Sequence, residues 1–504
     1  MVDHLRTALT ASTAKFLTLA GLATVLITWL LPQSNLLLIA CLLTATILAA
    51  IAVTRRPQAV YWVMLVALPL EATFVLEAGF SILPCYLLLG LQLLLLLVMR
   101  QPLRFDTAPV RIYLVYLLIA TLSLLFAFFV APPQVDTSAA MALRASGLRP
   151  FVQVVLLALN VCFFALVLQY NPDEHTALKS LQVYLAVAAA LALLGCWQSL
   201  AVPLDLPGKD FTQAFGAAAD QAYLYGETRY YSALVTDFAP RATFRESLHF
   251  SHFLVSILPL ALTLFIYRRK LPERWRLPGV SLLAAFGSAT LFLTMSRSGW
   301  IAMLAAMLFV AVFSPKRRIV KYAALAGLAL VVVGSAMTVV GFFRFDLNVW
   351  ELISIRLDAA RLESDPRVTY LSALWSTFKE YPLLGVGIGN YGAFGAAAVG
   401  IPTLLSAHSI FLNALVETGV LGFLAFSALI VHFFVKLLQG IASARGQAIY
   451  PYLVGIGGGV LGMTLQYFSF GDRPSFYYLF MLAIGYALLR AAAKKRVAST
   501  TFAP

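Results

Sequence analysis

Long apolar runs recur along almost the whole chain, and they constrain its fold more than any other feature. There are about fourteen, each of roughly 17–22 residues, the length of a helix that crosses a bilayer. The mean hydropathy of +0.87 and an apolar share of 61% agree with this pattern. The sequence therefore predicts an all-α integral membrane protein with about 14 transmembrane helices. The runs lie near 16–31, 35–53, 59–77, 80–99, 110–130, 151–170, 180–203, 248–267, 279–295, 299–314, 321–342, 409–438, 451–470 and 475–491.

Basic side chains gather on one side of the predicted membrane. With the N-terminus placed in the cytoplasm, the cytoplasmic segments hold most of the 36 Lys and Arg residues and few of the 22 Asp and Glu residues. This positive-inside bias explains the net charge of +14 by topology, so the charge does not indicate a nucleic-acid partner. Both termini are predicted to be cytoplasmic. The first apolar run lacks a small-residue cleavage site, so we expect a retained span rather than a cleaved signal.

The chain is predicted to form a single polytopic membrane domain over 1–504, without internal repeats. The absence of matching halves weighs against transporters that are built from repeats. Two outward segments are long: 204–247 is rich in Tyr, Gly and Ala, and 343–408 is a large loop. The cysteines have no metal-ligand spacing and are interpreted as small apolar core residues. They are Cys41, Cys85, Cys162 and Cys196.

An amphipathic helix is predicted inside the large loop, in "SDPRVTYLSALWSTFKEYP" (364–382). Asp365 suits an N-cap and Pro366 suits the first helical turn. Such a helix would lie on the membrane surface or over the mouth of a cavity. The following "GVGIGNYG" (385–392) has no Lys after its glycines and no βαβ context, so we interpret it as a flexible turn rather than a phosphate loop. The predicted apolar face comprises Val368, Leu371, Leu374, Trp375 and Phe378.

Arginines return to the outer side of the predicted membrane, where the topology leaves few basic residues. An arginine at a membrane boundary can simply extend its head into the headgroup layer. A guanidinium also suits a pyrophosphate, because it donates paired hydrogen bonds and keeps its charge. The candidates are Arg241, Arg245 and Glu246 in "APRATFRES" (239–247), Ser296 and Arg297 in "TMSRSGW" (294–300), and Arg367 at the start of the loop helix.

The segment "LLSAHSIFLNALVETGVLGFL" (404–424) begins a span but carries polar residues. Asn413 and Glu417 stand four residues apart, on one face of the predicted helix with Ser409. Such a stripe must face protein or a watery cavity. It either bonds neighbouring helices or lines a cavity under His408. A histidine at a helix start is often structural, but an imidazole titrates near neutral pH and suits a general base.

Two further titratable sites leave alternatives open. His249 and His252 are three residues apart on a predicted helix and could share a metal, but only Glu246 lies near them, so no metal site is predicted. Glu71, near the outer end of the third predicted span, could relay protons or pair with a buried arginine.

Together these segments resemble the superfamily of bacterial membrane glycosyltransferases that includes O-antigen ligases and the polymerases of O-antigen and exopolysaccharide. The resemblance runs from about Arg241 to Phe426 and is carried by "TMSRSGW", "DPRVTYLSALWSTFKEYPLLGVGIGNYG" and "AHSIFLNALVETGVLGFLAF". It implies a GT-C-like helical fold and an inverting glycosyltransferase without metal or cofactor. The implied donor is a glycan on undecaprenyl pyrophosphate, presented at the periplasmic face of the inner membrane. The implied acceptor is a hydroxyl of a glycan or of lipid A-core.

The resemblance also implies roles for individual residues. Arg241, Arg297 and Arg367 match the arginines that hold the pyrophosphate, with Arg245 beside the first, and His408 matches the base that deprotonates the acceptor. Two departures concern acceptor recognition: Ser409 stands where many relatives have Asn, and "ATFRES" lacks the usual Gly and Pro.

The sequence leaves three hypotheses, of which the leading one is a glycan polymerase or ligase of this superfamily. The Arg-Glu-Ser stretch at 245–247 slightly favours a repeat-unit polymerase over an O-antigen ligase that uses lipid A-core. A transporter or flippase for a lipid-linked anionic glycan would also need arginines near a cavity. A septal or elongation peptidoglycan polymerase shares the donor chemistry, but none of its motifs is found.

Overall fold

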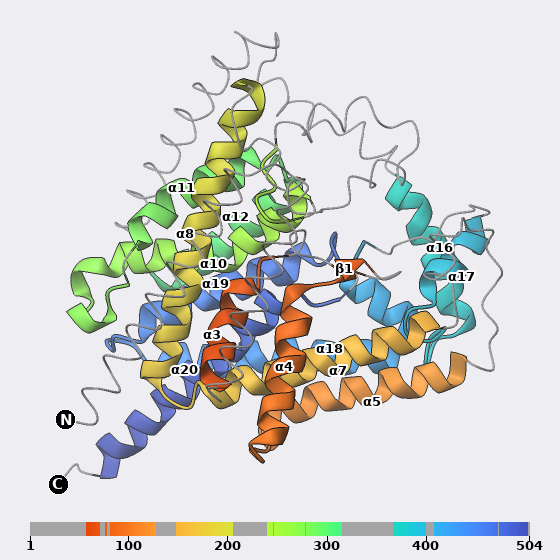
Figure 1. The fold of residues 1–504 in the computed structure, drawn as a ribbon, viewed down its shortest axis with the longest axis horizontal. Coiled ribbons are helices and arrows are strands. Elements are labelled where there is room, and N and C mark those ends of the chain that lie inside the picture. Colours follow the sequence, from red (N-terminus) through yellow and green to blue (C-terminus); the bar gives the residue numbers. More distant parts are fainter. Residues whose placement is uncertain are drawn as a thin grey trace.

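Helices form nearly all the regular structure in the computed structural model (Figure 1). The described residues are 57–70, 76–77, 81–127, 148–204, 239–244, 246–277, 279–314, 366–399, 408–471 and 473–501. Within these residues, the only regular structure that is not helical is a short antiparallel hairpin of β1 (Leu76–Glu77) and β2 (Ser81–Ile82). The helices are α3 (Pro57–Ala67), α4 (Pro84–Val98), α5 (Ala108–Ala127), α7 (Leu148–Tyr170), α8 (Glu174–Leu204), α10 (Ser247–Tyr267), η3 (Arg268–Lys270), η4 (Glu273–Trp275), α11 (Val280–Leu293), α12 (Arg297–Phe313), α16 (Pro366–Glu380), α17 (Tyr391–Val399), α18 (Ile410–Ser443), α19 (Tyr450–Gln466) and α20 (Phe476–Thr501).

The helical fold class is confirmed in its main point. Within the described residues, six helices are long and apolar enough to cross a membrane, namely α5, α7, α8, α10, α18 and α20, while α3, α4, α11 and α12 are apolar but shorter. Each span predicted in this part of the chain coincides with a helix. The helix at the span predicted for 59–77 is shorter than expected, because α3 ends at Ala67. The runs at 16–31, 35–53 and 321–342 lie outside the described residues, so the total of about fourteen spans stays a prediction.

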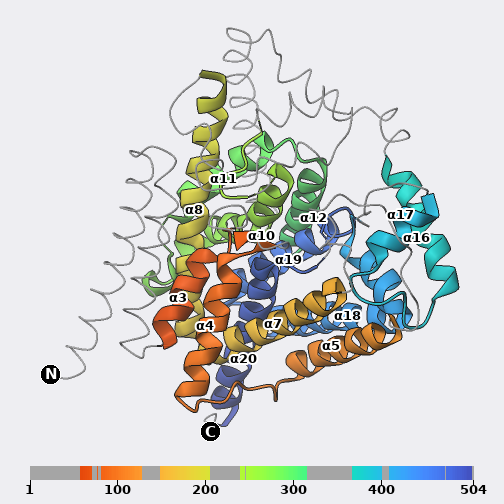
Figure 2. The ribbon, with the colours of Figure 1, turned by 45° about the vertical axis from the view of Figure 1, so that its right-hand side comes forward.

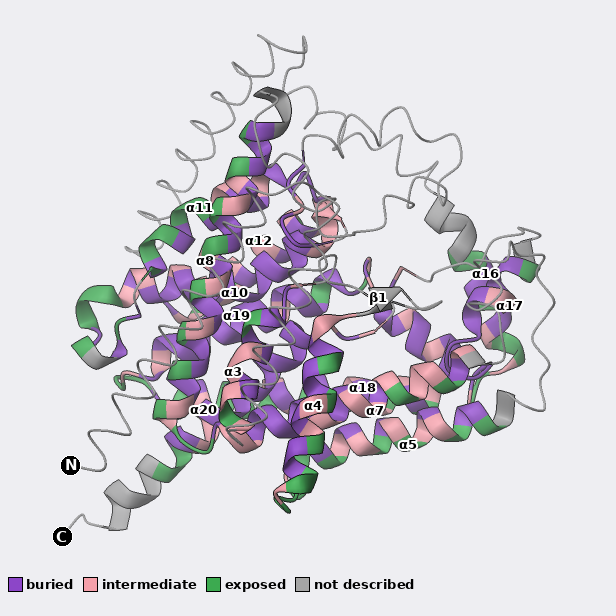
Figure 3. Cartoon of the chain, in the orientation of Figure 1, coloured by how far each residue is buried: buried purple, intermediate pink, exposed green. Residues whose placement is uncertain are grey.

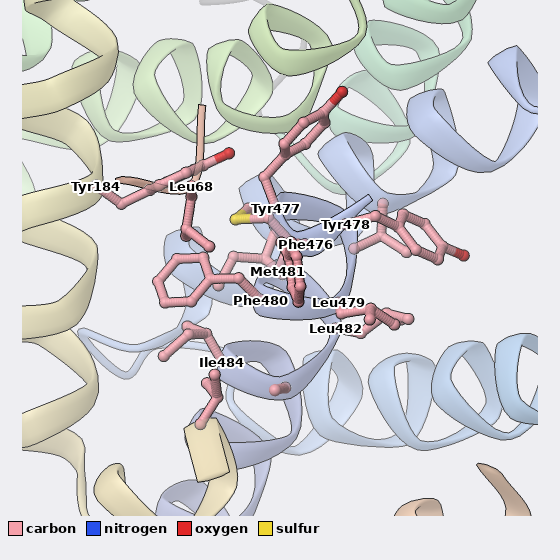
Figure 4. Close-up of a cluster of buried hydrophobic side chains, with 14 of the residues drawn as sticks. Leu68, Tyr184, Phe476, Tyr477, Tyr478, Leu479, Phe480, Met481, Leu482 and Ile484 are labelled. Carbon is pink, nitrogen blue, oxygen red and sulfur yellow. The ribbon is translucent and has the colours of Figure 1, made fainter. Parts of the chain in front are cut away.

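The core lies around α10 and α20. In each of these helices 83% of the membrane-length segment is buried inside the protein, against 39% in α5 and α18 (Figure 3). The first turns of α20 carry a dense set of aromatic and aliphatic side chains that meet Leu68 and Tyr184 (Figure 4). By contrast, α16 and α17 lie together at the edge of the molecule (Figures 1 and 2). Of the predicted site segments, only the one at 239–247 adjoins a central helix, because Arg297 begins α12 and His408 lies two residues before α18, which is less buried.

Glycines allow α19 to pack closely on α10 and α12. A Cβ atom at Gly459 would lie 2.3 Å from the carbonyl oxygen of Ser256, and one at Gly462 would lie 2.9 Å from that of Ala302. Small residues at such contacts let helix backbones approach each other, which strengthens van der Waals packing in a membrane. The glycines of α19 therefore set how closely its second half approaches α10 and α12.

We expect Gly459→Ala to lower the free energy of unfolding by about 3 kcal/mol, because the added methyl group has to displace backbone. The measurement is thermal unfolding of the purified protein in detergent. Gly90→Ala in α4 is the matched control, since a Cβ atom there meets nothing within 4 Å. Equal unfolding temperatures for the two variants would contradict the close packing described for α19.

Candidate functional site

Three of the predicted site segments meet at one end of the helical bundle. The helices α10, α12 and α18 begin at this end, and α19 finishes there. The side-chain amide of Gln466, the last residue of α19, donates to the hydroxyls of Ser251 (3.0 Å) and Ser298 (3.4 Å). The next carbonyl, that of Tyr467, accepts from the amide of Ile410 at 3.1 Å. The end of α19 thus joins the Arg297 segment to the His408 segment.

Ser296 shapes the turn that presents Arg297. It is the N-cap of α12, and its hydroxyl accepts from the amide of Gly299 at 3.2 Å. The hydroxyl of Ser251 on α10 donates to the same oxygen at 2.9 Å. Arg297 is therefore the first helical residue of an anchored turn. It is half-buried, and its guanidinium makes no hydrogen bond or ion pair with the other described residues.

The Arg241 turn is held by its backbone. The Oε1 atom of Gln198 on α8 accepts from the amides of Arg241 (3.1 Å) and Ala242 (2.7 Å). The hydroxyl of Thr243 donates to the carbonyl of Pro69 at 2.8 Å, and the ring of Phe244 stacks on α10. These contacts fix the turn while the Arg241 side chain stays half-buried.

The neighbouring acidic and basic candidates are less completely described. Glu246 occupies the N-cap position of α10, with an extended backbone and no side-chain capping bond. Arg245 lies outside the described residues. Arg367 lies in the first turn of α16, but nothing is described of its side chain. The assignment of Arg245 and Arg367 to a pyrophosphate site therefore stays a prediction.

Left-handed backbone conformations mark all three turns. Ala242, Met295 and His408 have φ values of 49°, 52° and 46°. Within the described residues, the only other non-glycine residue with positive φ is Arg100. This conformation is strained for residues with a Cβ atom and persists only where the surrounding structure enforces it, often at functional sites. The strained residues therefore lie in the three segments that were predicted to form the site, those of Arg241, Arg297 and His408.

His408 lies two residues before the start of α18. Ser409 is the N-cap, and its hydroxyl accepts from the amide of Leu412 at 3.4 Å. One face of the helix then carries Asn413, whose amide donates to the carboxylate of Glu417 at 3.5 Å. That carboxylate also accepts from the amide of Tyr391, the first residue of α17, at 3.4 Å. These hydrogen bonds favour the alternative in which the polar residues of this face bond to a neighbouring helix. That they also line a cavity under His408 stays a prediction.

The glycine-rich segment after α16 is packed against a break in α18. Gly419 has non-helical angles (φ 66°, ψ −172°), which exposes the backbone of α18 to hydrogen bonding. The amides of Val386 and Gly387 donate to the carbonyls of Val416 and Glu417 at 2.9 and 3.0 Å. The segment 385–390 is a turn, as predicted, but it is buried, and the amides of Val386, Gly387 and Ile388 are paired with other elements, which does not fit the flexibility expected of it.

The loop helix α16 begins at Pro366, as predicted, but its inner face differs from the expected one. Leu374 is buried against Val386 and Val416. Leu371 and Trp375, which were expected on the same apolar face, are 48% and 53% exposed. Phe378 packs against the same cluster, as expected, and the buried face also includes Ala373 and Thr377.

We expect Gly385→Ala to lower the free energy of unfolding by about 3 kcal/mol and to reduce activity. Gly385 has a φ of +69°, and a Cβ atom there would lie 2.3 Å from the carbonyl oxygen of Val416. Gly279→Ala separates the two effects, because Gly279 also has a positive φ (+76°) but open space around it. Thermal unfolding should show a loss of only about 1 kcal/mol for the control. An equal loss in both variants would exclude the backbone contact as the cause.

The paired histidines have structural contacts. The Nδ1 atom of His252 lies 3.1 Å from Oε1 of Gln466, and its ring packs on Tyr467 and Phe470. His249 meets the ring of Phe470 edge-on. In the part of the chain that the structure describes, no group of three or more His, Cys, Asp and Glu side chains could hold a metal. Glu71 lies outside this part.

Sequence reasoning missed Gln466, although this residue links three helices. Its amide contacts Ser251, His252 and Ser298 and is buried. A usable signal was present, because Gln466 is a strongly polar residue at the end of an otherwise apolar, glycine-rich helix.

A comparison with known protein families points to the same region of the chain. Residues 280–427 match the family model of O-antigen ligase. The match spans Arg297, Arg367, His408 and Glu417 and leaves out Arg241. It confirms the resemblance to the O-antigen ligase and polymerase superfamily, and with the apolar helices it indicates a multi-pass membrane enzyme of glycan assembly. No curated protein matches the chain.

Proposed function

We propose that this chain, which carries the O-antigen ligase family region over 280–427, is an inverting, metal-independent glycosyltransferase of surface polysaccharide biosynthesis. It would transfer a glycan from undecaprenyl pyrophosphate to an acceptor hydroxyl. The observation that supports this most is the meeting of the Arg241, Arg297 and His408 segments at one end of the bundle.

In the proposed reaction, the bond between the sugar C1 atom and the pyrophosphate oxygen breaks as the acceptor oxygen attacks C1 from the opposite face. Negative charge then develops on the departing pyrophosphate, and fixed cations lower the barrier where charge develops. The guanidinium groups of Arg241 and Arg297 would supply this stabilisation, together with Arg245 and Arg367. His408 would accept the proton of the acceptor hydroxyl.

The proposed function also requires a particular orientation of the chain in the membrane. We infer a single membrane domain over 1–504 in a bacterial inner membrane, with cytoplasmic termini and a periplasmic loop at 343–408. The basic segments between spans support this orientation through the positive-inside rule. The site would then open to the face at which lipid-linked glycans are assembled into polymers.

Within the superfamily we favour a repeat-unit polymerase, on the Arg-Glu-Ser stretch at 245–247. The test is to incubate the purified protein in lipid with an undecaprenyl-pyrophosphate repeat unit alone and to resolve the products on a gel. A ladder supports the polymerase. Product only after addition of lipid A-core indicates a ligase. Movement of the substrate across the bilayer without any new bond would contradict both and favour a transporter.

A further inference from the structure

The described residues between α19 and α20, 467–471 and 473–475, lie at the end of the bundle described above. The ring of His252 on α10 packs against the rings of Tyr467 and Phe470, at 4.4 and 4.8 Å between centroids. The carbonyl of Tyr467 accepts from Ile410, two residues after His408. This turn therefore touches the first turns of both α10 and α18.

Arg473 in this turn has an unusual environment. Its guanidinium carbon lies 5.8 Å from the centre of the Tyr86 ring on α4, which is cation–π distance. Its Nη1 atom is buried and has no hydrogen-bond partner among the described residues. A buried donor on a charged group is costly when it stays unpaired. An anion bound beside this nitrogen would remove that cost.

The backbone around Arg473 is fixed on its C-terminal side. The amide of Asn160 on α7 donates to the carbonyl of Pro474 at 3.5 Å. The amide of Ser475 donates to the hydroxyl of Tyr467 at 2.8 Å, so the two ends of the turn are tied together. A side chain that is held on rigid supports loses little freedom when it binds a ligand.

Aromatic contacts connect Arg473 to the Arg241 turn. The ring of Tyr86, beneath the guanidinium, meets Phe476 at 4.7 Å, and the neighbouring Tyr477 meets Phe244 at 6.3 Å. Tyr477 and Tyr478 leave the first turn of α20 in different directions (Figure 4). Arg473 thus belongs to a turn whose contacts reach both the Arg241 segment and the His408 segment.

We propose that Arg473 binds a phosphate oxygen of the lipid-linked pyrophosphate, as a further arginine beside Arg241 and Arg297. This inference rests on the proposed function. A planar guanidinium held over an aromatic ring suits a diphosphate, because it donates in a fixed geometry and never loses its charge. A phospholipid headgroup carries a phosphate of the same chemistry, so the experiment has to separate the two sources.

The test measures binding of undecaprenyl pyrophosphate to the full-length protein in phosphatidylcholine nanodiscs, by microscale thermophoresis. We expect Arg473→Gln to raise the Kd about 10- to 100-fold, the loss typical of a hydrogen bond to a charged group. Arg473→Lys should raise it about tenfold, because the paired donors are lost. Arg268→Gln, at the opposite end of α10, should leave it unchanged. A second arm counts phosphatidylglycerol molecules retained in native mass spectra, which Arg473→Gln should not alter.

The outcomes separate this inference from the function on which it rests. A Kd of wild-type value in Arg473→Gln overturns it, as does a loss of retained phosphatidylglycerol with unchanged binding of undecaprenyl pyrophosphate. If the Gln variant does not fold, the Lys variant decides, and an unchanged Kd there overturns the inference. If Arg297→Gln weakens binding and Arg473→Gln does not, Arg473 alone is excluded. Failure of the wild-type protein to bind would overturn the proposed function itself.

Discussion

His408→Ala is expected to lower the rate of glycan transfer by about 10²- to 10⁴-fold, the contribution typical of a general base. The donor affinity should stay near the wild-type value, because the proposed role of the imidazole is to remove a proton from the acceptor. Initial rates at saturating donor, with the Kd for undecaprenyl pyrophosphate measured separately, provide the test.

Two controls separate chemistry from backbone strain at this position. His408 has a φ of 46°, and Asn tolerates this conformation better than other residues with a Cβ atom. His408→Asn should therefore keep the turn intact and be as inactive as the Ala variant. Ser409→Ala removes the N-cap of α18 and should cost about 1 kcal/mol of stability with little loss of rate. Full transfer by His408→Asn would exclude the general-base role.

Arg297→Gln is expected to lower kcat/KM by about 10²- to 10³-fold, as removal of one charge-stabilising group does in other enzymes. The position supports this role, because Arg297 begins α12 and the helix N-terminus itself favours a bound anion. Arg297→Lys should recover part of the loss, since it keeps the charge but loses the paired donors.

The measurement for Arg297 is kcat/KM for the lipid-linked donor at a fixed acceptor concentration. Arg104→Gln is the matched control, because Arg104 is an exposed arginine between α4 and α5, at the opposite end of the bundle. We expect a wild-type value there. An unchanged kcat/KM in Arg297→Gln would remove this residue from the pyrophosphate site.

The helices were the most predictable part of the fold. A helix across a membrane has to be apolar along its whole length, so the runs located α10 and α18 to within a few residues. The start of α16 at Pro366 was also predictable, because proline fits the first turn and not the interior. These features depend on local sequence alone.

The details of the site depend on contacts between distant segments, and the sequence did not reveal them. The break of α18 at Gly419 exists because 382–387 pairs with its backbone. The left-handed turns at Ala242 and Met295 are enforced by their surroundings, since neither residue prefers this conformation. The buried face of α16 likewise follows from the segment against which it packs.

Arg473 shows a different limit of the sequence argument. The candidate arginines were chosen within the resemblance, which runs from about Arg241 to Phe426, and Arg473 lies beyond it. Its interest comes from the unpaired Nη1 atom and the Tyr86 ring, which only the three-dimensional arrangement brings together.

The most direct test of the central claim is a transfer reaction with purified protein, the lipid-linked donor and a chelator of divalent metals. The products are analysed by NMR for the configuration of the new glycosidic bond and by mass spectrometry for undecaprenyl pyrophosphate. We predict a new bond of inverted configuration, one undecaprenyl pyrophosphate released per bond, and no reaction with His408→Asn. Retention of configuration, or transfer that stops when metal is removed, would contradict the mechanism proposed for this chain.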